Sequence, residues 1–516
     1  MLVSFDGLGA DALAGQRGLP AFDHLASHGA TARVIPVSPT VTSTTHVSMI
    51  TGAEPQRTGI VSNRYHAPGT PIEQTSRGME TDIDVETLVE AAHRQGKRVG
   101  AVSFPTIDAR NARRSADFGL VWSDSMTPGR IIKLTSADFR REWVPPTWSD
   151  RPHPRRSFSP IMRARIEWSV PKKARADVDI VAYDTTDDRV ENYDLYFVED
   201  GEREITPDAQ GWFAISSRTA DGLYGSWSKL LQPTSSLNLS IYWGTISRTN
   251  AYPDSFRAML DEEAGFWPGS PDEHSGIDAQ TFTEQLVRLS DFLTRAQTTA
   301  IRRMPFDLLL AYQPNVDGAM HTYLGAPEGD AVIRAAFVAA DRAVAEIGGL
   351  LDSSRDALIV TGDHGLVRTL RDVRPNRMLA EAGFAPRWRA YVSGSVAHFY
   401  RFSGDDDADA VVAMLNASGL FELVEKKSAT SHRNSGDVLA IAQPDIDLSA
   451  SSDPPAVATA ASGGHHGGLN THRELHSAFL ASGAGIPTGD LGEIAQTSIA
   501  RFVAQLLGIQ PPSSAK

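Results

Sequence analysis

Hydroxyl side chains that could act as nucleophiles gather at one place near the start of this sequence. The stretch SPTVTSTT carries six of them directly before a helix-like run: Ser38, Thr40, Thr42, Ser43, Thr44 and Thr45. Such residues often cap a helix, because their oxygens accept hydrogen bonds from the free N–H groups of its first turn. Alternatively, one hydroxyl is a nucleophile held over a helix N-terminus, where an anion is stabilised. The stretch by itself leaves both interpretations open.

Carboxyl and imidazole side chains recur as close pairs further along the chain. Asp317 and His321 in DGAMH are four residues apart, so they share one face if the segment is helical. Asp363 and His364 in TGDHG are adjacent and directly follow an apolar run. Each pair has a structural alternative, since an Asp and a His at such spacing also arise by chance. The pairs therefore indicate a site only when they are taken together.

Two neighbouring histidines, His465 and His466, lie in a loop between four glycines. Side-chain packing is a poor explanation for them there, which favours a functional role. The chain has no cysteine, so disulfides and thiolate chemistry are excluded. Oxygen and nitrogen ligands without thiolate suit zinc or another borderline divalent ion.

The elements that must position these residues alternate between strand and helix. Apolar runs predict strands at 2–5, 98–104, 306–315 and 357–365, and helical spacing predicts helices at 84–95 and 331–351. Such alternation predicts an α/β fold with a largely parallel central sheet sandwiched by helices. Ligands bind at the carboxyl ends of the strands in such sheets. Asp6, Asp317 and Asp363 all come just after a predicted strand.

The chain changes character between about residues 145 and 250, where period-two runs such as LNLSIYW predict short strands. Eight of the nine tryptophans lie between Trp122 and Trp267, and we expect these aromatics to form a small core there. The expected organisation is a discontinuous catalytic core, residues 1–140 and 255–516, with a β-rich inserted cap domain at 141–254.

Composition limits the partners. The 516 residues carry a formal net charge of −14 and no long basic run, which disfavours a nucleic-acid duplex. No apolar stretch approaches the roughly 20 residues that span a bilayer. The first residues already read as a core strand, so we expect a leader before them and an extracytoplasmic location, periplasmic or secreted. A cytoplasmic location and the oligomeric state stay open.

In their order, these motifs resemble the type I phosphodiesterase/nucleotide pyrophosphatase family of the alkaline phosphatase superfamily. The similarity rests on SFDG, then PTVTSTTHVSMITG with GIVSN, then DGAMH, GDHG and HHGG. It covers residues 1 to about 120 and about 300 to 480, and leaves the insertion out. The resemblance implies an alkaline phosphatase-like fold and a small phosphate-ester substrate.

The resemblance also implies a two-metal phosphodiesterase in which Thr42 is the nucleophile and becomes a phosphothreonine intermediate. Asn63 would bind a phosphoryl oxygen. Asp6, Thr42, Asp363 and His364 would hold one divalent ion. Asp317, His321 and His466 would hold the other. Zinc is the ion we expect at both sites, since it accepts this ligand set.

Two departures from the family pattern bear on this interpretation. Thr45 precedes His46 where relatives often have asparagine, which affects the fine geometry of the turn. Pro105 and Ile107 stand where monoesterase relatives carry a Lys-x-Arg pair, with Arg110 nearby, and this favours diesters. The alternatives are a phosphomonoesterase, a phosphonate hydrolase, or a metal-binding module without turnover. The leaving group, the metal, the role of the insertion and the native N-terminus stay open.

Overall fold

The protein is described by a computed structural model covering residues 1–108, 113–122, 127–141, 157–170, 174–201, 203–220, 222–231, 237–271, 275–404 and 407–515. It divides into two compact units. The first comprises Met1–Trp122, Ala251–Phe256 and Leu293–Lys516, and the second Ser123–Asn250 and Arg257–Phe292. The inserted domain expected at 141–254 stays a prediction, since compactness within one chain does not establish an independently folding domain.

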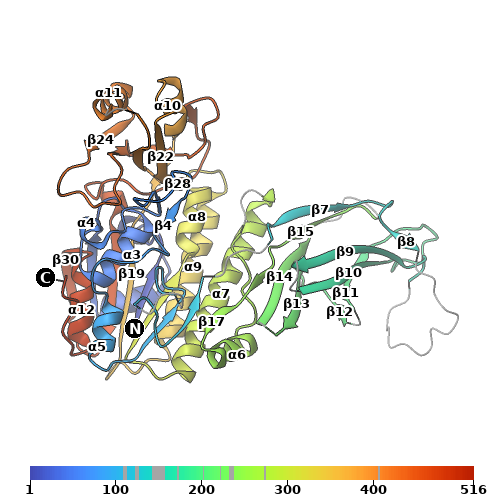
Figure 1. The fold of residues 1–516 in the computed structure, drawn as a ribbon. Coiled ribbons are helices and arrows are strands. Elements are labelled where there is room, and N and C mark those ends of the chain that lie inside the picture. The colour runs from blue at the N-terminus through green and yellow to red at the C-terminus, as the bar shows by residue number, and fades with distance from the viewer. Residues whose placement is uncertain are drawn as a thin grey trace. The chain divides into compact units, whose positions relative to one another are not determined.

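A nine-stranded sheet forms the centre of the first unit (Figure 1). Its strand order is β17-β6-β5-β18-β1-β19-β29-β2-β30. The bounds are β1 Leu2–Phe5, β2 Ala30–Ile35, β5 Val99–Val102, β6 Phe118–Val121, β17 Asn250–Tyr252, β18 Leu308–Gln313, β19 Ala357–Gly362, β29 Ser477–Gly483 and β30 Gly489–Ala495. Strand β1 pairs in parallel with both β18 and β19, while β29 is antiparallel to its neighbours. The predicted α/β class with a largely parallel sheet is confirmed.

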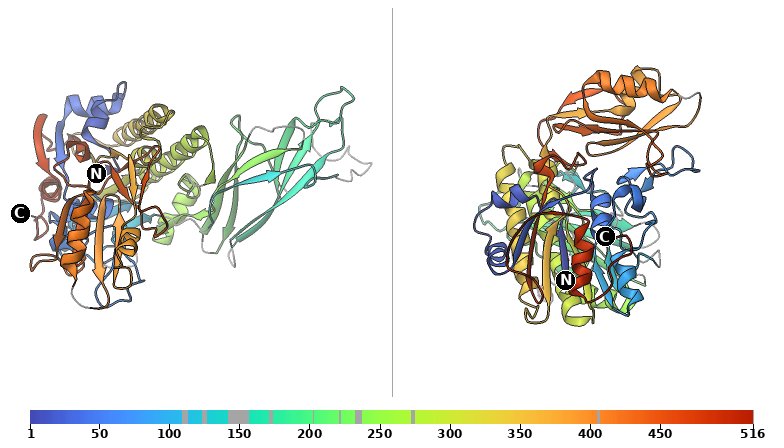
Figure 2. Two further views of the ribbon diagram at one scale, coloured as in Figure 1. Left: turned by 90° about the horizontal axis from the view of Figure 1, so that it is seen from above. Right: turned by 90° about the vertical axis from the view of Figure 1, so that its left-hand side faces the viewer.

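Helices cover both faces of this sheet (Figure 2). On one face lie α3 Thr42–Thr51, α5 Leu88–Arg94 and α12 Ser498–Leu506, and on the other α2 Pro20–His28, α8 Asn315–Tyr323 and α9 Gly329–Gly348. Successive side chains of a strand point to opposite faces. Leu2 accordingly packs in the core of the first face, and Val3 and Phe5 in that of the second. This double burial explains why the strands read as continuous apolar runs.

Smaller elements complete the first unit. A four-stranded sheet, β22-β23-β25-β24, shares a core with α10 and α11. Their bounds are α10 Pro375–Glu381, β22 Trp388–Ser393, β23 Val396–Arg401, α11 Ala408–Ser418, β24 Phe421–Lys426 and β25 Val438–Ala442. The short strands and helices are α1 Ala10–Ala14, α4 Pro55–Thr58, β3 Arg64–Tyr65, β4 Ser76–Arg77, β20 Val367–Arg368, β21 Arg371–Val373, β26 Ile446–Leu448, β27 Val457–Thr459, β28 Gly464–His465 and η3 Arg473–Leu475.

The second unit is β-rich, as its period-two runs predict. One sheet has the order β12-β11-β10-β9-β8, and the other is β13-β14-β15-β7 with β16 beside β14. Their bounds are β7 Arg130–Leu134, β8 Arg140–Arg141, β9 Met162–Val170, β10 Ala174–Tyr183, β11 Leu195–Asp200, β12 Arg203–Ile205, β13 Trp212–Thr219, β14 Gly222–Leu230, β15 Leu239–Trp243 and β16 Ser247–Arg248. Helices α6 Asp254–Glu263 and α7 Ala279–Arg303 follow in the chain. Both sheets contribute to one apolar core, which contains Trp168 and Trp243.

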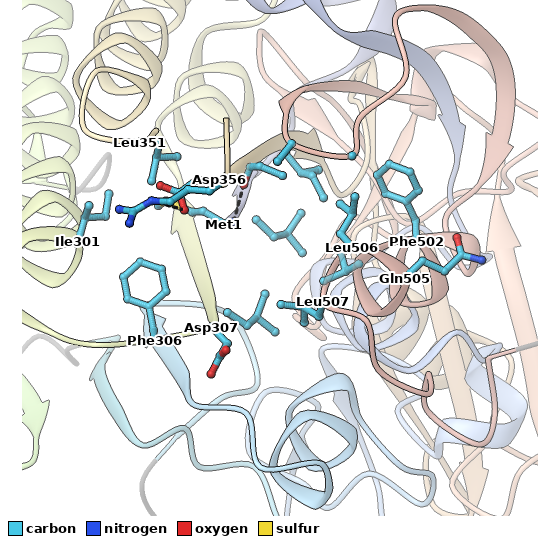
Figure 3. A pocket seen from close by; sticks show the side chains of 18 of the residues that line it. Met1, Ile301, Phe306, Asp307, Leu351, Asp356, Phe502, Gln505, Leu506 and Leu507 are labelled. Carbon is cyan, nitrogen blue, oxygen red and sulfur yellow. Dashed lines mark hydrogen bonds and ion pairs between the residues drawn. The ribbon is translucent and has the colours of Figure 1, made fainter. Parts of the chain in front are cut away.

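A cavity of about 810 Å³ opens at the amino ends of the central strands (Figure 3). Its lining includes Met1, Phe306, Asp356 and Leu506 and none of the candidate site residues. The candidate ligands follow the carboxyl ends of the same strands, so the cavity lies at the opposite edge of the sheet. In the ranges that the structure describes, no helix is both long enough and apolar enough to cross a bilayer.

Candidate metal centre

Three carboxylates meet at the carboxyl edge of the central sheet. Phe5, the last residue of β1, is in register with Gln313 of β18 and Gly362 of β19. Asp6 and Asp363 directly follow two of these strands, and Asp317 lies in the first turn of α8, which follows the third. Asp6 is 2% exposed and Asp363 is fully buried. Strand order thus brings Asp6 together with two acids that lie more than 300 residues further along the chain.

The turn from Asp6 into Gly7 requires glycine. Gly7 has φ +69°, a left-handed conformation that residues with a Cβ rarely adopt. A Cβ there would also lie 2.8 Å from the Cα of Asp317 and 2.7 Å from Leu366. The Gly7 N–H donates to Asp363 Oδ1 at 3.2 Å. The glycine of the SFDG motif therefore allows the segments carrying the acids to approach one another.

Thr42 is the first residue of α3, and its hydroxyl faces the carboxylates. Its Oγ1 lies 3.4 Å from His364 Nε2. That nitrogen is 3.1 Å from Asp363 Oδ2 and 3.4 Å from Asp6 Oδ1. Asp6, Asp363 and His364 offer ligand atoms within 4.8 Å of one another, a spacing that could hold one metal ion.

A second group of possible ligands adjoins the first. Asp317, His364 and His466 also offer atoms within 4.8 Å of one another, so His364 belongs to both groups. His321 lies beside them, with its Nε2 3.3 Å from Asp317 Oδ1 and its ring centre 5.1 Å from that of His466. The i, i+4 spacing of Asp317 and His321 on α8 does bring their side chains together. His465, by contrast, is hydrogen-bonded through Nδ1 to Thr369 Oγ1 at 2.7 Å and belongs to neither group.

Backbone carbonyls determine where two of these imidazoles carry their proton. His466 Nδ1 is 2.9 Å from the Thr40 carbonyl oxygen, and His364 Nδ1 is 3.2 Å from that of Gly365. A carbonyl oxygen can only accept, so in each ring Nδ1 carries the hydrogen and donates it. The Nε2 lone pair is then free to ligate a metal, an arrangement common among metal-binding histidines.

The centre combines crowded carboxylates with one charged imidazole: burial opposes charge on His321, but the Asp317 carboxylate raises the pKa of this histidine to about 9. Burial raises the pKa of Asp6 well above its ordinary range, and the carboxylates of Asp317 and Asp363 add to this shift. Burial, reinforced by Asp317, also raises the pKa of Asp363 to about 7. The pKa values of His364 and His466 fall well below the ordinary range, first because both rings are buried. Neutral imidazoles and crowded carboxylates are the state that a bound cation stabilises.

Orphaned oxygens support the same interpretation. Among the residues that the structure describes, Asp6 Oδ1 and Asp317 Oδ1 are buried and have no partner in good hydrogen-bond geometry. The imidazole nitrogens beside them are His364 Nε2, 3.4 Å from Asp6 Oδ1, and His321 Nε2, 3.3 Å from Asp317 Oδ1. Leaving a buried carboxylate oxygen unpaired is unfavourable unless an ion or a donor satisfies it. Carboxylate oxygens without a well-formed hydrogen bond, together with the imidazole lone pairs of His364 and His466, fit divalent ions such as zinc.

Asn63 approaches this edge from the segment before β3. The Ser43 backbone N–H donates to Asn63 Oδ1 at 2.8 Å. This bond fixes the amide orientation and leaves its Nδ2 hydrogens as donors for another group. Arg110, the basic residue considered as a phosphate contact, lies outside the described residues.

Sequence reasoning missed several side chains that hold the candidate ligands. The Tyr312 hydroxyl donates to Asp6 Oδ2, and Thr45 Oγ1 donates to Asp363 Oδ2 at 3.2 Å. His46 Nδ1 lies 3.4 Å from the same oxygen of Asp363. The only sequence signal for Tyr312 is its place near the end of a strand that leads to a candidate ligand. The sequence presented Thr45 and His46 only as residues of the hydroxyl-rich turn, with no indication that they contact Asp363.

Comparison with known proteins gives a family match and a fold match. The family model described as type I phosphodiesterase/nucleotide pyrophosphatase matches residues 1–469. No curated protein matches the chain directly. Solved structures of murine and human ectonucleotide pyrophosphatase/phosphodiesterase 5 are similar in fold, with TM-scores of 0.56 and 0.55 and identities of 13% and 14%. Each alignment covers 99% of this chain and 95% of the other. A further murine structure, also at 0.56 and 13%, is of an inactive threonine-to-alanine variant in complex with AMP.

Proposed function

Because the chain belongs to the type I phosphodiesterase/nucleotide pyrophosphatase family, we propose that it hydrolyses phosphate diesters or nucleotide pyrophosphate bonds with Thr42 as the attacking group. The observation that carries the proposal is the position of the Thr42 hydroxyl, 3.4 Å from His364 Nε2 at the edge of the acidic centre. Thr40, Thr44 and Thr45 share the segment but are completely buried, whereas Thr42 is 8% exposed. A substrate can reach only a hydroxyl that is open to it.

The reaction we propose has two displacements at phosphorus. Thr42 Oγ1 attacks first, so that the Oγ1–P bond forms and the bond from phosphorus to the leaving oxygen breaks. Water then attacks the phosphothreonine, which still carries the second ester group; the Oγ1–P bond breaks, a phosphate monoester leaves, and the Thr42 hydroxyl is restored. The inactive threonine-to-alanine variant of the murine protein supports a threonine in this role. Splitting the reaction in this way is the general advantage of a covalent intermediate.

The surrounding residues bind and orient the substrate. Thr42 begins α3, so backbone N–H groups of the first helical turn face the phosphoryl oxygens and the helix dipole favours their charge. The Nδ2 group of Asn63, oriented by the Ser43 N–H, donates to a second phosphoryl oxygen. Phosphoryl transfer depends mainly on such positioning and charge stabilisation.

We propose that the centre holds two divalent ions. Asp6, Thr42, Asp363 and His364 would hold one, and Asp317, His321 and His466 the other. When bound, such ions lower the pKa of a ligated hydroxyl and neutralise charge on the phosphoryl group and the leaving oxygen. Tyr312 and Thr45 keep the carboxylates of Asp6 and Asp363 oriented toward the centre.

The test is Thr42→Ala with Thr44→Ala as its matched control. Thr44 lies in the same turn, but its hydroxyl donates to the carbonyls of Pro39 and Val41 and does not face the centre. Hydrolysis of bis(p-nitrophenyl) phosphate with added zinc should fall by about 10⁴-fold or more in Thr42→Ala. It should change little in Thr44→Ala. A rapid acid quench of the unmodified enzyme should trap a p-nitrophenyl phosphoryl group on the peptide that contains Thr42.

The proposal fails if Thr42→Ala keeps its activity or if Thr44→Ala alone abolishes it. An active enzyme that never accumulates the esterified phosphoryl group on the Thr42 peptide, under conditions that trap such intermediates, would indicate direct attack by water. The non-enzymatic alternative predicts zinc binding with no turnover of any diester, and the same assay distinguishes it.

A further inference from the structure

His46 is a fully buried imidazole that the proposed reaction does not use. It lies in α3, one turn after Thr42, and its side chain has no exposed surface. Both ring nitrogens make close polar contacts. Nδ1 is 2.8 Å from the Thr42 carbonyl oxygen, and Nε2 is 2.9 Å from the hydroxyl oxygen of Ser4.

The chemistry of its partners determines the direction of these hydrogen bonds. The Thr42 carbonyl oxygen only accepts, so His46 Nδ1 carries a hydrogen and donates it. An imidazole that carries its hydrogen on Nδ1 has its lone pair on Nε2. The Ser4 hydroxyl therefore donates to Nε2. The two hydrogen bonds thus run in one direction: the Ser4 hydroxyl donates to the imidazole, and the imidazole donates to the Thr42 carbonyl.

This chain of hydrogen bonds joins two segments of the candidate centre. Ser4 lies in β1 two residues before Asp6, and side chains two apart on a strand share a face. Thr42 begins the helix that packs on that face. The imidazole is further held by Phe104 and Tyr312, whose ring centres lie 5.3 Å and 5.6 Å from it in edge-on contact. Tyr312 is also the residue that donates to Asp6.

We propose that His46 is a positioning residue that, together with Ser4, holds the Thr42 turn against the strand that carries Asp6. The inference rests on the proposed function of Thr42 as the attacking group. His46 is buried behind the turn and does not touch the substrate, so it acts through the Thr42 carbonyl, with a second contact of its Nδ1 to Asp363 Oδ2 at 3.4 Å. A displacement of about 1 Å at an attacking atom reduces a rate by about 10²-fold, which is the size of effect we expect.

The experiment compares His46→Leu with His46→Asn. Leucine fills much of the same space without a donor, whereas the Nδ2 of asparagine occupies nearly the place of the imidazole Nδ1 and can donate to Thr42. With bis(p-nitrophenyl) phosphate, kcat should fall about 10²-fold in His46→Leu while KM changes little. His46→Asn should recover about tenfold or more of that loss. Zinc content per chain should equal that of the unmodified protein in both variants.

Ser4→Ala tests the other end of the chain of hydrogen bonds and removes a single oxygen. It frees the imidazole without opening a large cavity, and we expect a decrease in kcat of about tenfold with KM unchanged. If the melting temperature of His46→Leu shows that this variant does not fold, Ser4→Ala tests the positioning role in its place. The amount of p-nitrophenyl phosphoryl group trapped on Thr42 during turnover should fall in the same order as kcat.

The positioning role is overturned if folded His46→Leu has the kcat of the unmodified enzyme, or if His46→Asn is as impaired as His46→Leu. An unchanged kcat in Ser4→Ala also contradicts it. Thr42→Ala assayed in parallel separates the two proposals. If that variant stays active, the proposed function itself fails. If it is inactive while His46→Leu is fully active, only the role of His46 fails.

Discussion

Removing divalent metal should lower the melting temperature of the first unit. The size of this decrease should depend on His466 and not on the adjacent His465. His466 belongs to the second group of possible ligands, whereas its neighbour His465 bonds to Thr369. The comparison is therefore between His466→Ala and His465→Ala, each stripped with a chelator and then titrated with zinc. Both variants remove a buried imidazole, so their baseline stabilities fall for similar reasons and the response to zinc is what separates them.

The expected magnitude follows from ligand linkage. One site at a free zinc concentration of about 100 times its Kd stabilises the native state by about 2.7 kcal/mol, and two sites by about 5 kcal/mol. The first unit has about 350 residues and hence an unfolding entropy of about 0.7 kcal/mol/K. Zinc should thus raise the melting temperature by about 7 °C in the unmodified protein and in His465→Ala, and by about 4 °C in His466→Ala.

Scanning calorimetry with and without zinc measures these shifts, and elemental analysis counts the ions. One further site needs a control, since the exposed His24 and His28 stack on α2 with ring centres 4.2 Å apart. Two histidines one helical turn apart can bind zinc on their own. A His24→Ala/His28→Ala double variant should keep the full thermal shift. The reasoning is refuted if His466→Ala responds to zinc like the unmodified protein, or if His465→Ala is the variant that loses part of the response.

Two further predictions concern substrate preference and pH. Bis(p-nitrophenyl) phosphate should be hydrolysed with a higher kcat/KM than p-nitrophenyl phosphate, because the resemblance places Pro105 and Ile107 where monoesterase relatives carry a basic pair for a dianion, and a clear preference for the monoester would contradict this. The pKa of buried His398 is lowered to about 4, first by burial, while its nitrogens pair with the Val61 carbonyl and the Gly436 N–H. The unfolded chain protonates His398 near pH 6.5, whereas the folded chain protonates it only near pH 4. The free energy of unfolding should therefore decrease by about 3 kcal/mol as the pH falls from 6.5 to 4. In urea titrations across that range His398→Gln should show a shallower decline, and an unchanged decline would refute the assignment.

Local patterns in the sequence predicted central strands of the sheet and singled out the candidate ligands that follow them. An apolar run followed by Asp, as at Asp6 and Asp363, indicates a strand that ends in a polar side chain. Adjacent residues alone carry this signal, so the sequence is enough to detect it. The four-residue spacing of Asp317 and His321 predicts a shared face for the same reason. The ordered motifs also predicted the family, which the family match confirms.

Only the tertiary structure decided which side chains meet. The order β18-β1-β19 brings Asp6, Asp317 and Asp363 to one edge, and nothing local in the sequence specifies strand order. The contacts of Tyr312 with Asp6 and of His46 with Ser4 join residues 306 and 42 positions apart. The orientations of His465 and His466 differ because Thr369 holds one and the Thr40 carbonyl holds the other. These side-chain directions depend on packing between distant segments, which a pattern of neighbouring residues does not contain.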